Sequence, residues 1–131
     1  MFKKSDIIDG AYRECIFSDH FKASLSDASA RGAKIRVLIP ISLGNIESVK
    51  LLLKIEARIR NKDIGRLKLV ITEREALIGI HDEKGYYGYH FESKDFCRFL
   101  RAAFDAIWGD DSDLSQDVTE ENLKTLTFPL F

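Results

Sequence analysis

This chain has few of the residues that cross-link or interrupt a backbone, with two cysteines and two prolines among 131 residues. Cys15 and Cys97 are far apart and lack the close spacing of metal ligands, so we expect buried free thiols in a reducing cytoplasm. No long apolar run follows Met1 or occurs later, which argues against a signal peptide and a membrane span. These absences predict a soluble, cytoplasmic protein with no membrane partner.

The chain also lacks the strongly basic balance of a typical nucleic-acid-binding domain, because its formal net charge is -1. The charge is unevenly distributed. After residue 109, six acidic residues and the single base Lys124 carry -5, which leaves +4 on the preceding part. We therefore expect one domain over residues 1–109 and, over residues 110–131, an acidic linker and an apolar C-terminal tail.

Sequence motifs that hold metals or nucleotides are missing too. His20, His81 and His90 show no HxH or HExxH spacing, and the glycines form neither GxGxxG nor a P-loop. The serines near His20 are not part of a GxSxG nucleophile elbow. We therefore expect no metal, no cofactor and no serine hydrolase chemistry.

Alternating and helical hydrophobic patterns predict an α/β fold, with a mixed β-sheet of about five strands covered by helices on both faces. The 45% hydrophobic content is enough for one core. Expected helices cover residues 7–16, 19–31, 45–53, 93–108 and 118–126. Expected strands cover residues 34–39, 57–60, 66–72, 76–80 and 86–91.

The chain is organised around the predicted hairpin from Gly65 to Ile80. Arg66 and Lys68 are two residues apart, so their side chains project from the same face of a strand. If that face opens onto a cleft, the two cations can bind an anion. If it faces solvent, it is an ordinary polar strand surface, and the alternation alone allows both interpretations.

Three segments together resemble a known family. Ala30 to Pro40 reads as a helix, an Arg-Gly step and a strand, Gly65 to Gly79 reads as a central hairpin, and Phe96 to Trp108 reads as a closing helix. In this order they resemble the phospholipase-D-like domains that occur in archaeal TrmB-type transcriptional regulators. The resemblance covers roughly residues 18–109 and implies a phospholipase-D-like half-domain.

Catalytic members of that family carry an H-x-K-x4-D motif on the hairpin. The matching positions here are Arg66, Lys68 and Glu73, so only the lysine is retained in kind. Arginine stays protonated and has no usable lone pair, which excludes it as a phosphoryl nucleophile. The family also begins with a strand, whereas residues 7–16 read as a helix. That strand is either lost or replaced by a short piece near Cys15 to Phe17.

The resemblance and the residues together predict a non-catalytic regulatory or sensor domain that works as a homodimer in transcription regulation. Arg66 and Lys68 would bind a small anionic or sugar-like ligand, Glu73 would orient Lys68, and Tyr87 or His90 would close the side of the site. We expect contact with DNA only through a separate partner or a missing domain.

Two alternatives stay open at the level of the sequence. One is a phosphodiesterase or nuclease with a rebuilt site, in which His90 or His81 is the nucleophile. The other is a purely structural dimerisation module. Dimerisation itself is suggested by the resemblance and by the surplus of apolar residues on the last helix and the segment Leu126 to Phe131.

Overall fold

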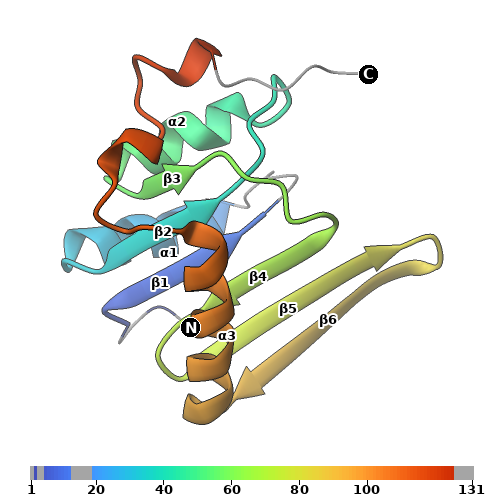
Figure 1. Ribbon diagram of the computed structural model, residues 1–131. Coiled ribbons are helices and arrows are strands. Elements are labelled where there is room, and N and C mark those ends of the chain that lie inside the picture. Colours follow the sequence, from blue (N-terminus) through green and yellow to red (C-terminus); the bar gives the residue numbers. More distant parts are fainter. Residues whose placement is uncertain (1, 3–4, 13–18, 126–131) are drawn as a thin grey trace.

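The computed structural model describes residues 2, 5–12 and 19–125, which form an open mixed sheet with helices on both faces (Figure 1). The six strands have the order β3-β2-β1-β4-β5-β6. The α/β fold class is therefore confirmed, with one strand more than expected. The strands are β1 Ile7–Ala11, β2 Lys34–Leu38, β3 Arg58–Arg60, β4 Leu67–Ile71, β5 Glu75–Asp82 and β6 Gly85–Glu92. The helices are α1 Asp19–Ala30, α2 Ile46–Lys54 and α3 Lys94–Trp108, with 3-10 turns at Leu114–Gln116 and Leu123–Thr125.

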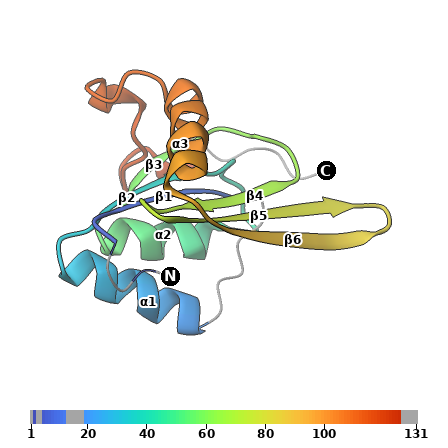
Figure 2. The ribbon, with the colours of Figure 1, turned by 90° about the horizontal axis from the view of Figure 1, so that it is seen from below.

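The central strand β1 is where the sheet changes from parallel to antiparallel pairing. β1 is parallel to β2, and β2 is parallel to β3, whereas β4, β5 and β6 continue the sheet in antiparallel fashion. Helices α1 and α2 cover one face and α3 crosses the other (Figure 2). Each face buries its own apolar cluster, so the predicted coverage on both sides is confirmed.

The predicted helix over residues 7–16 is wrong, because Ile7–Ala11 is the strand β1. Ile8 is buried against α1 and α2, and Ala11 is buried against α3 on the opposite face. A short strand that is buried on both faces loses the alternating pattern, and periodicity cannot then distinguish it from a helix. The alternative first strand near Cys15 to Phe17 lies outside the described residues.

The ends of the helices follow their sequence signals. α1 is followed by Gly32 at a φ of 91°, a conformation that favours glycine. Ser93 caps α3 by accepting a hydrogen bond from the backbone N–H of Phe96. Cys97 in α3 is a buried free thiol as expected, whereas Cys15 lies outside the described residues. No described helix is both long enough and apolar enough to span a bilayer.

The segment after α3 lies against the sheet. The backbone N–H of Val118 donates to the carbonyl of Ile59, and Asp117 forms an antiparallel bridge with Arg60. Val118 and Leu123 are buried in the core beneath α2. Of the helix expected over residues 118–126, the described part forms only the 3-10 turn at Leu123–Thr125. The division into residues 1–109 and 110–131 stays a prediction.

We predict that Gly10→Ala destabilises the fold. A Cβ atom at Gly10 would lie 2.7–2.9 Å from two ring carbons and the hydroxyl oxygen of Tyr12, whose side chain is buried and cannot move aside easily. Overpacking of this kind costs about 1–3 kcal/mol, measurable as a lower urea midpoint. Gly44→Ala is the control, because a Cβ there meets its nearest atom at 3.7 Å. An unchanged midpoint for Gly10→Ala would contradict the packing around β1.

Candidate functional site

A buried carboxylate lies at the centre of the sheet. Asp9 in β1 has no exposed surface, and Arg36 from β2 donates to both of its oxygens, with Nε–Oδ1 2.8 Å and Nη2–Oδ2 3.0 Å. Arg101 from α3 donates through Nε to Oδ2 at 2.8 Å. A buried charge is tolerated only when it is paired and hydrogen-bonded, and Asp9 satisfies both conditions.

The same two arginines connect Asp9 to further elements. Arg36 donates through Nη2 to Asp105 of α3 at 2.6 Å, and Arg101 donates to the carbonyl of Ile71 in β4. The network therefore joins three neighbouring strands to the helix that covers them. These contacts are explained by a structural role, which is to hold α3 against the strands.

Trp108 at the end of α3 lies among three guanidinium groups. Its fully buried ring has Arg60 at 4.5 Å, Arg36 at 5.3 Å and Arg58 at 5.4 Å, measured from the Cζ atom to the ring centroid. Cations over an indole face are attracted by its negative electrostatic potential. The ring therefore helps three like charges from β2 and β3 to lie close together.

Arg60 is almost completely buried and closes the end of α3. It donates to the carbonyls of Trp108, Asp110 and Asp113, and its Nε donates to Asp117 at 3.0 Å. The last carbonyls of a helix have no partner within it, so this side chain satisfies groups that burial would otherwise leave costly. These contacts hold the acidic segment, residues 110–117, against the end of β3.

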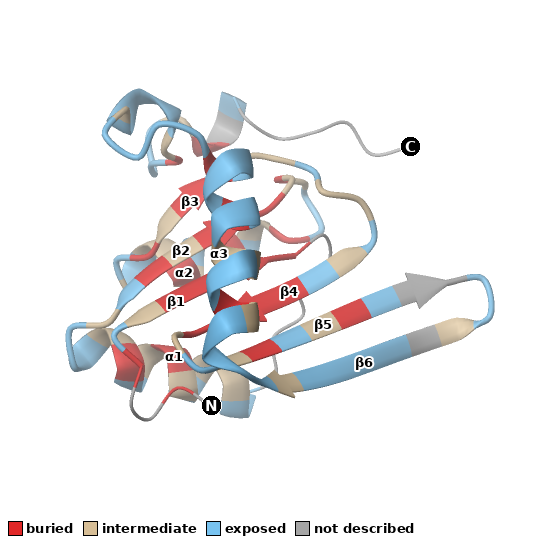
Figure 3. Ribbon diagram, turned by 60° about the horizontal axis from the view of Figure 1, so that its bottom comes forward, coloured by how far each residue is buried: buried red, intermediate tan, exposed pale blue. Residues whose placement is uncertain are grey.

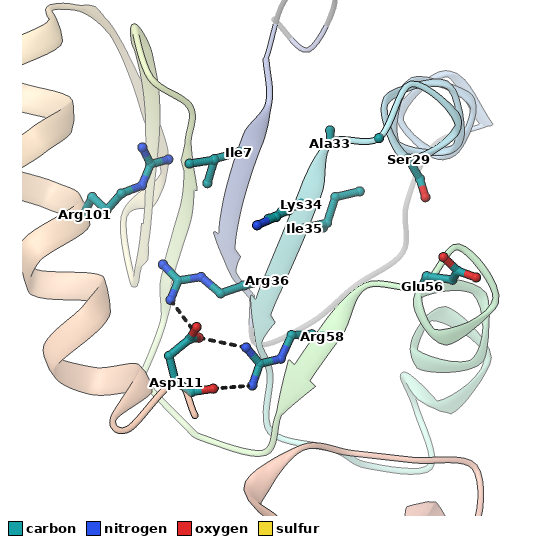
Figure 4. A pocket seen from close by; sticks show the side chains of 11 residues that line it. Ile7, Ser29, Ala33, Lys34, Ile35, Arg36, Glu56, Arg58, Arg101 and Asp111 are labelled. Carbon is teal, nitrogen blue, oxygen red and sulfur yellow. Dashed lines mark hydrogen bonds and ion pairs between the residues drawn. The ribbon is translucent and has the colours of Figure 1, made fainter. Parts of the chain in front are cut away.

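A cavity of about 600 Å³ opens beside these arginines, at the edge of the sheet where β1, β2 and β3 begin (Figure 4). The ends of α1 and α2 form its opposite wall. Its lining combines cationic, acidic and apolar side chains. The residues are Ile7, Ser29, Gly32, Ala33, Lys34, Ile35, Arg36, Glu56, Arg58, Arg101 and Asp111.

Asp111 of the acidic segment reaches into this cavity and binds two of its arginines. Its Oδ1 lies 2.8 Å from Nη1 of Arg58 and 3.5 Å from Nη1 of Arg36 (Figure 4). Partial desolvation acts to raise its pKa, but the two guanidinium groups outweigh it, so the pKa of Asp111 is lowered. The side chain is nevertheless 64% exposed, so it meets solvent while bound to both arginines.

The lining of the cavity is suited to binding an anion. Four cationic side chains line it, and guanidinium groups bind carboxylates and phosphates through paired hydrogen bonds. None of the described lining residues is a histidine or a cysteine. The hydroxyl of Ser29 donates to the carbonyl of Ile55 in the wall between α1 and α2.

The site residues predicted from the hairpin lie elsewhere. Arg66 is exposed just before β4 and is not among the residues that line the cavity beside Asp111. Lys68 is also exposed, with its Nζ 5.8 Å from the ring centroid of Tyr12. Glu73 accepts hydrogen bonds from the backbone N–H groups of Asp6 and Ile7, which fixes the start of β1.

Tyr87 and His90 are both exposed on β6. Tyr87 pairs with Ile80, whereas His90 projects from the opposite face, where its Nε2 lies 3.2 Å from Oε1 of Glu75. Glu92 joins this pair, and one ligand atom from each of the three side chains lies within 4.8 Å of the others. The side chain of His81, the other predicted nucleophile, lies outside the described set.

Sequence reasoning missed the residues that form the arginine network. Asp9 was hidden in a segment that reads as a helix, and no motif in the sequence singles out Arg36, Arg58 or Arg101. One signal was available, since a chain with an acidic end and a basic body can pair the two parts. The particular partners depend on the tertiary fold.

No protein-family model matches this chain, and no curated protein matches its sequence. Among solved structures, the chain is similar to TrmBL2, an archaeal chromatin protein whose structure shows a novel mode of DNA binding. The TM-score is 0.61 at 11% sequence identity, and the match covers 82% of this chain and 45% of the other. The chain thus spans less than half of that protein. This likeness confirms a relation in fold to a TrmB-type protein, whereas the phospholipase-D-like assignment stays a prediction.

We predict that Asp9→Asn lowers the free energy of unfolding by about 3 kcal/mol or more, because it leaves two largely buried arginines without their shared charge. Urea denaturation measures the change. Asp27→Asn on the exposed side of α1 is the matched control and should leave the stability unchanged. Equal stability of the two variants would show that the network does not hold the fold together.

Proposed function

We propose that this chain is a non-catalytic regulatory domain of a transcription-associated protein, and that it forms a homodimer and binds a small anion. The similarity in fold to an archaeal chromatin protein supports the transcription-associated part. Contact with DNA would belong to a separate partner or to a further domain, because the net charge of -1 does not favour direct binding to phosphates.

The observation that carries the ligand proposal is the position of Asp111. Its carboxylate lies between Arg36 and Arg58 while most of its surface faces solvent. An oxyanion therefore has room and partners at this point of the cavity. A ligand with a carboxylate or phosphate, including a sugar phosphate, would take the place of Asp111, and Lys34 would supply a further cation from the same wall.

The resemblance to phospholipase-D-like domains predicts a different ligand site, at Arg66 and Lys68. An experiment can distinguish this site from the cavity beside Asp111. We predict that inorganic phosphate or glucose 6-phosphate raises the melting temperature of the protein, and that Lys34→Ala reduces this shift because it removes an exposed cation of the cavity. Differential scanning fluorimetry measures both effects. Lys50→Ala on the exposed side of α2 is the control, with a full shift expected.

Arg66→Ala decides between the two places. A shift that is unchanged in Arg66→Ala and reduced in Lys34→Ala supports the cavity. The reverse result supports the hairpin residues predicted from the sequence. Absence of any shift with the wild-type protein would contradict ligand sensing and leave a structural dimerisation module.

We also predict no hydrolysis of bis(p-nitrophenyl) phosphate. The residue at the nucleophile position of the family motif is Arg66, and His90 is hydrogen-bonded to Glu75 outside the cavity. Release of p-nitrophenol is the measurement, with and without added divalent cations. Hydrolysis by the wild type that is lost in His90→Ala would contradict the proposed function and indicate a phosphodiesterase.

A further inference from the structure

We infer that the exposed side of α3, together with the adjoining face of the β5–β6 hairpin, is the surface on which two copies of this chain pair with their α3 helices antiparallel. This inference rests on the homodimer in the proposed function and names the surface and geometry that would form it. Two charges of opposite sign on α3, Arg98 and Asp105, would pair with each other across a two-fold axis, which indicates a second copy and not another protein.

Large apolar side chains gather on this side of the molecule. Those of β5 and β6 project from the face of the sheet that α3 crosses, and the others are exposed on α3 itself. Singly exposed apolar residues are normal on a protein surface, but several large ones on the same side of a molecule can mark an interaction site. The group contains Ile80, Tyr87, Tyr89, Phe99 and Ile107, exposed by 42%, 43%, 48%, 68% and 42%.

Aromatic rings connect the two parts of this surface. Phe91 of β6 contacts Phe96 of α3 with centroids 4.7 Å apart, and Phe96 stacks on Phe99 at 6.3 Å. The end of β6 and the first turns of α3 are therefore packed together. Figure 3 shows that the outer side of α3 and most of the described length of β6 are exposed.

Small residues accompany Phe99 along the outer side of α3. Ala102, Ala103 and Ala106 are all exposed, and steps of three or four residues place them on the same side as Phe99. Small side chains allow two helices to approach closely, whereas a solvent-facing helix more often carries charged residues at such positions. The outer side of α3 thus has the composition of a helix-packing surface.

Two charges on α3 determine the direction of pairing. Arg98 and Asp105 are seven residues apart, which is about 10.5 Å along the same flank of the helix. If two helices pack antiparallel about a two-fold axis beside Ala102, Arg98 of each copy lies opposite Asp105 of the partner subunit. The symmetry repeats this ion pair, as an isologous interface requires. Asp105 is 53% exposed, so it can accept a second partner beside Arg36.

The first experiment tests the apolar surface with the full chain, by sedimentation velocity and light scattering at micromolar concentrations. We expect a dimer for the wild type and a monomer for Phe99→Glu, with a dissociation constant raised by roughly tenfold or more. Leu114→Glu is the matched control and should remain dimeric, because Leu114 is 67% exposed but lies after α3, outside the proposed surface. The near-ultraviolet circular dichroism signal of the buried Trp108 checks that each variant is folded.

The second experiment tests the antiparallel ion pairs by charge reversal. Arg98→Asp and Asp105→Arg each place like charges opposite one another in a homodimer, so each variant alone should dissociate more readily. Near-ultraviolet circular dichroism checks that Asp105→Arg stays folded without its contact to Arg36. Mixed in equal amounts, the two variants should form a heterodimer, because both pairs across the interface are then of opposite charge. Two differently labelled chains make the heterodimer measurable by energy transfer.

The outcomes separate this inference from the proposed function. A wild-type dimer that persists in Phe99→Glu, or that shows no preference for the mixed pair, overturns the surface but leaves the homodimer standing. A monomeric wild type overturns both the surface and the homodimer, while the phosphate-dependent thermal shift tests ligand sensing separately. If the wild type is a dimer but phosphate does not raise its melting temperature, only the proposal of ligand binding is overturned.

Discussion

The fold depends on the pairing of one buried carboxylate with two arginines that come from distant parts of the chain. Asp9 would be costly in the centre of a sheet without Arg36 and Arg101, and each arginine in turn fixes a different element against β1. Replacing the three by apolar residues could preserve packing, but it would remove the directional contacts that align α3 across the strands. The network therefore contributes specificity of arrangement as much as stability.

The uneven charge of the chain has a structural explanation at the same place. Asp111 and Asp117 neutralise arginines that β2 and β3 present side by side, so the acidic segment compensates the basic body within one molecule. A carboxylate that binds from a partly exposed segment also resembles an anion bound from solution. The segment would then compete with a ligand, and its release would signal that the cavity is occupied.

Much of the fold could be predicted from the sequence, because α1, α2, α3 and the strands β2 to β6 carry periodic patterns and clear end signals. β1 could not, since a strand buried on both faces has no alternation to detect. The site was harder to predict. The sequence places Arg66 and Lys68 on a hairpin, but the arginines beside Asp111 are brought together only by pairing of β1, β2 and β3 and by the crossing of α3.

The order of the strands has a consequence for synthesis on the ribosome. β1 emerges first and ends up in the interior, with β2 and β3 added on one side before β4, β5 and β6 are added on the other. The first half can therefore form a parallel β-α-β-α-β unit while the rest is still being translated. Its second face, including Ala11 and Leu38, stays uncovered until α3 has left the exit tunnel. During that interval the nascent chain has an apolar surface on which a chaperone could act.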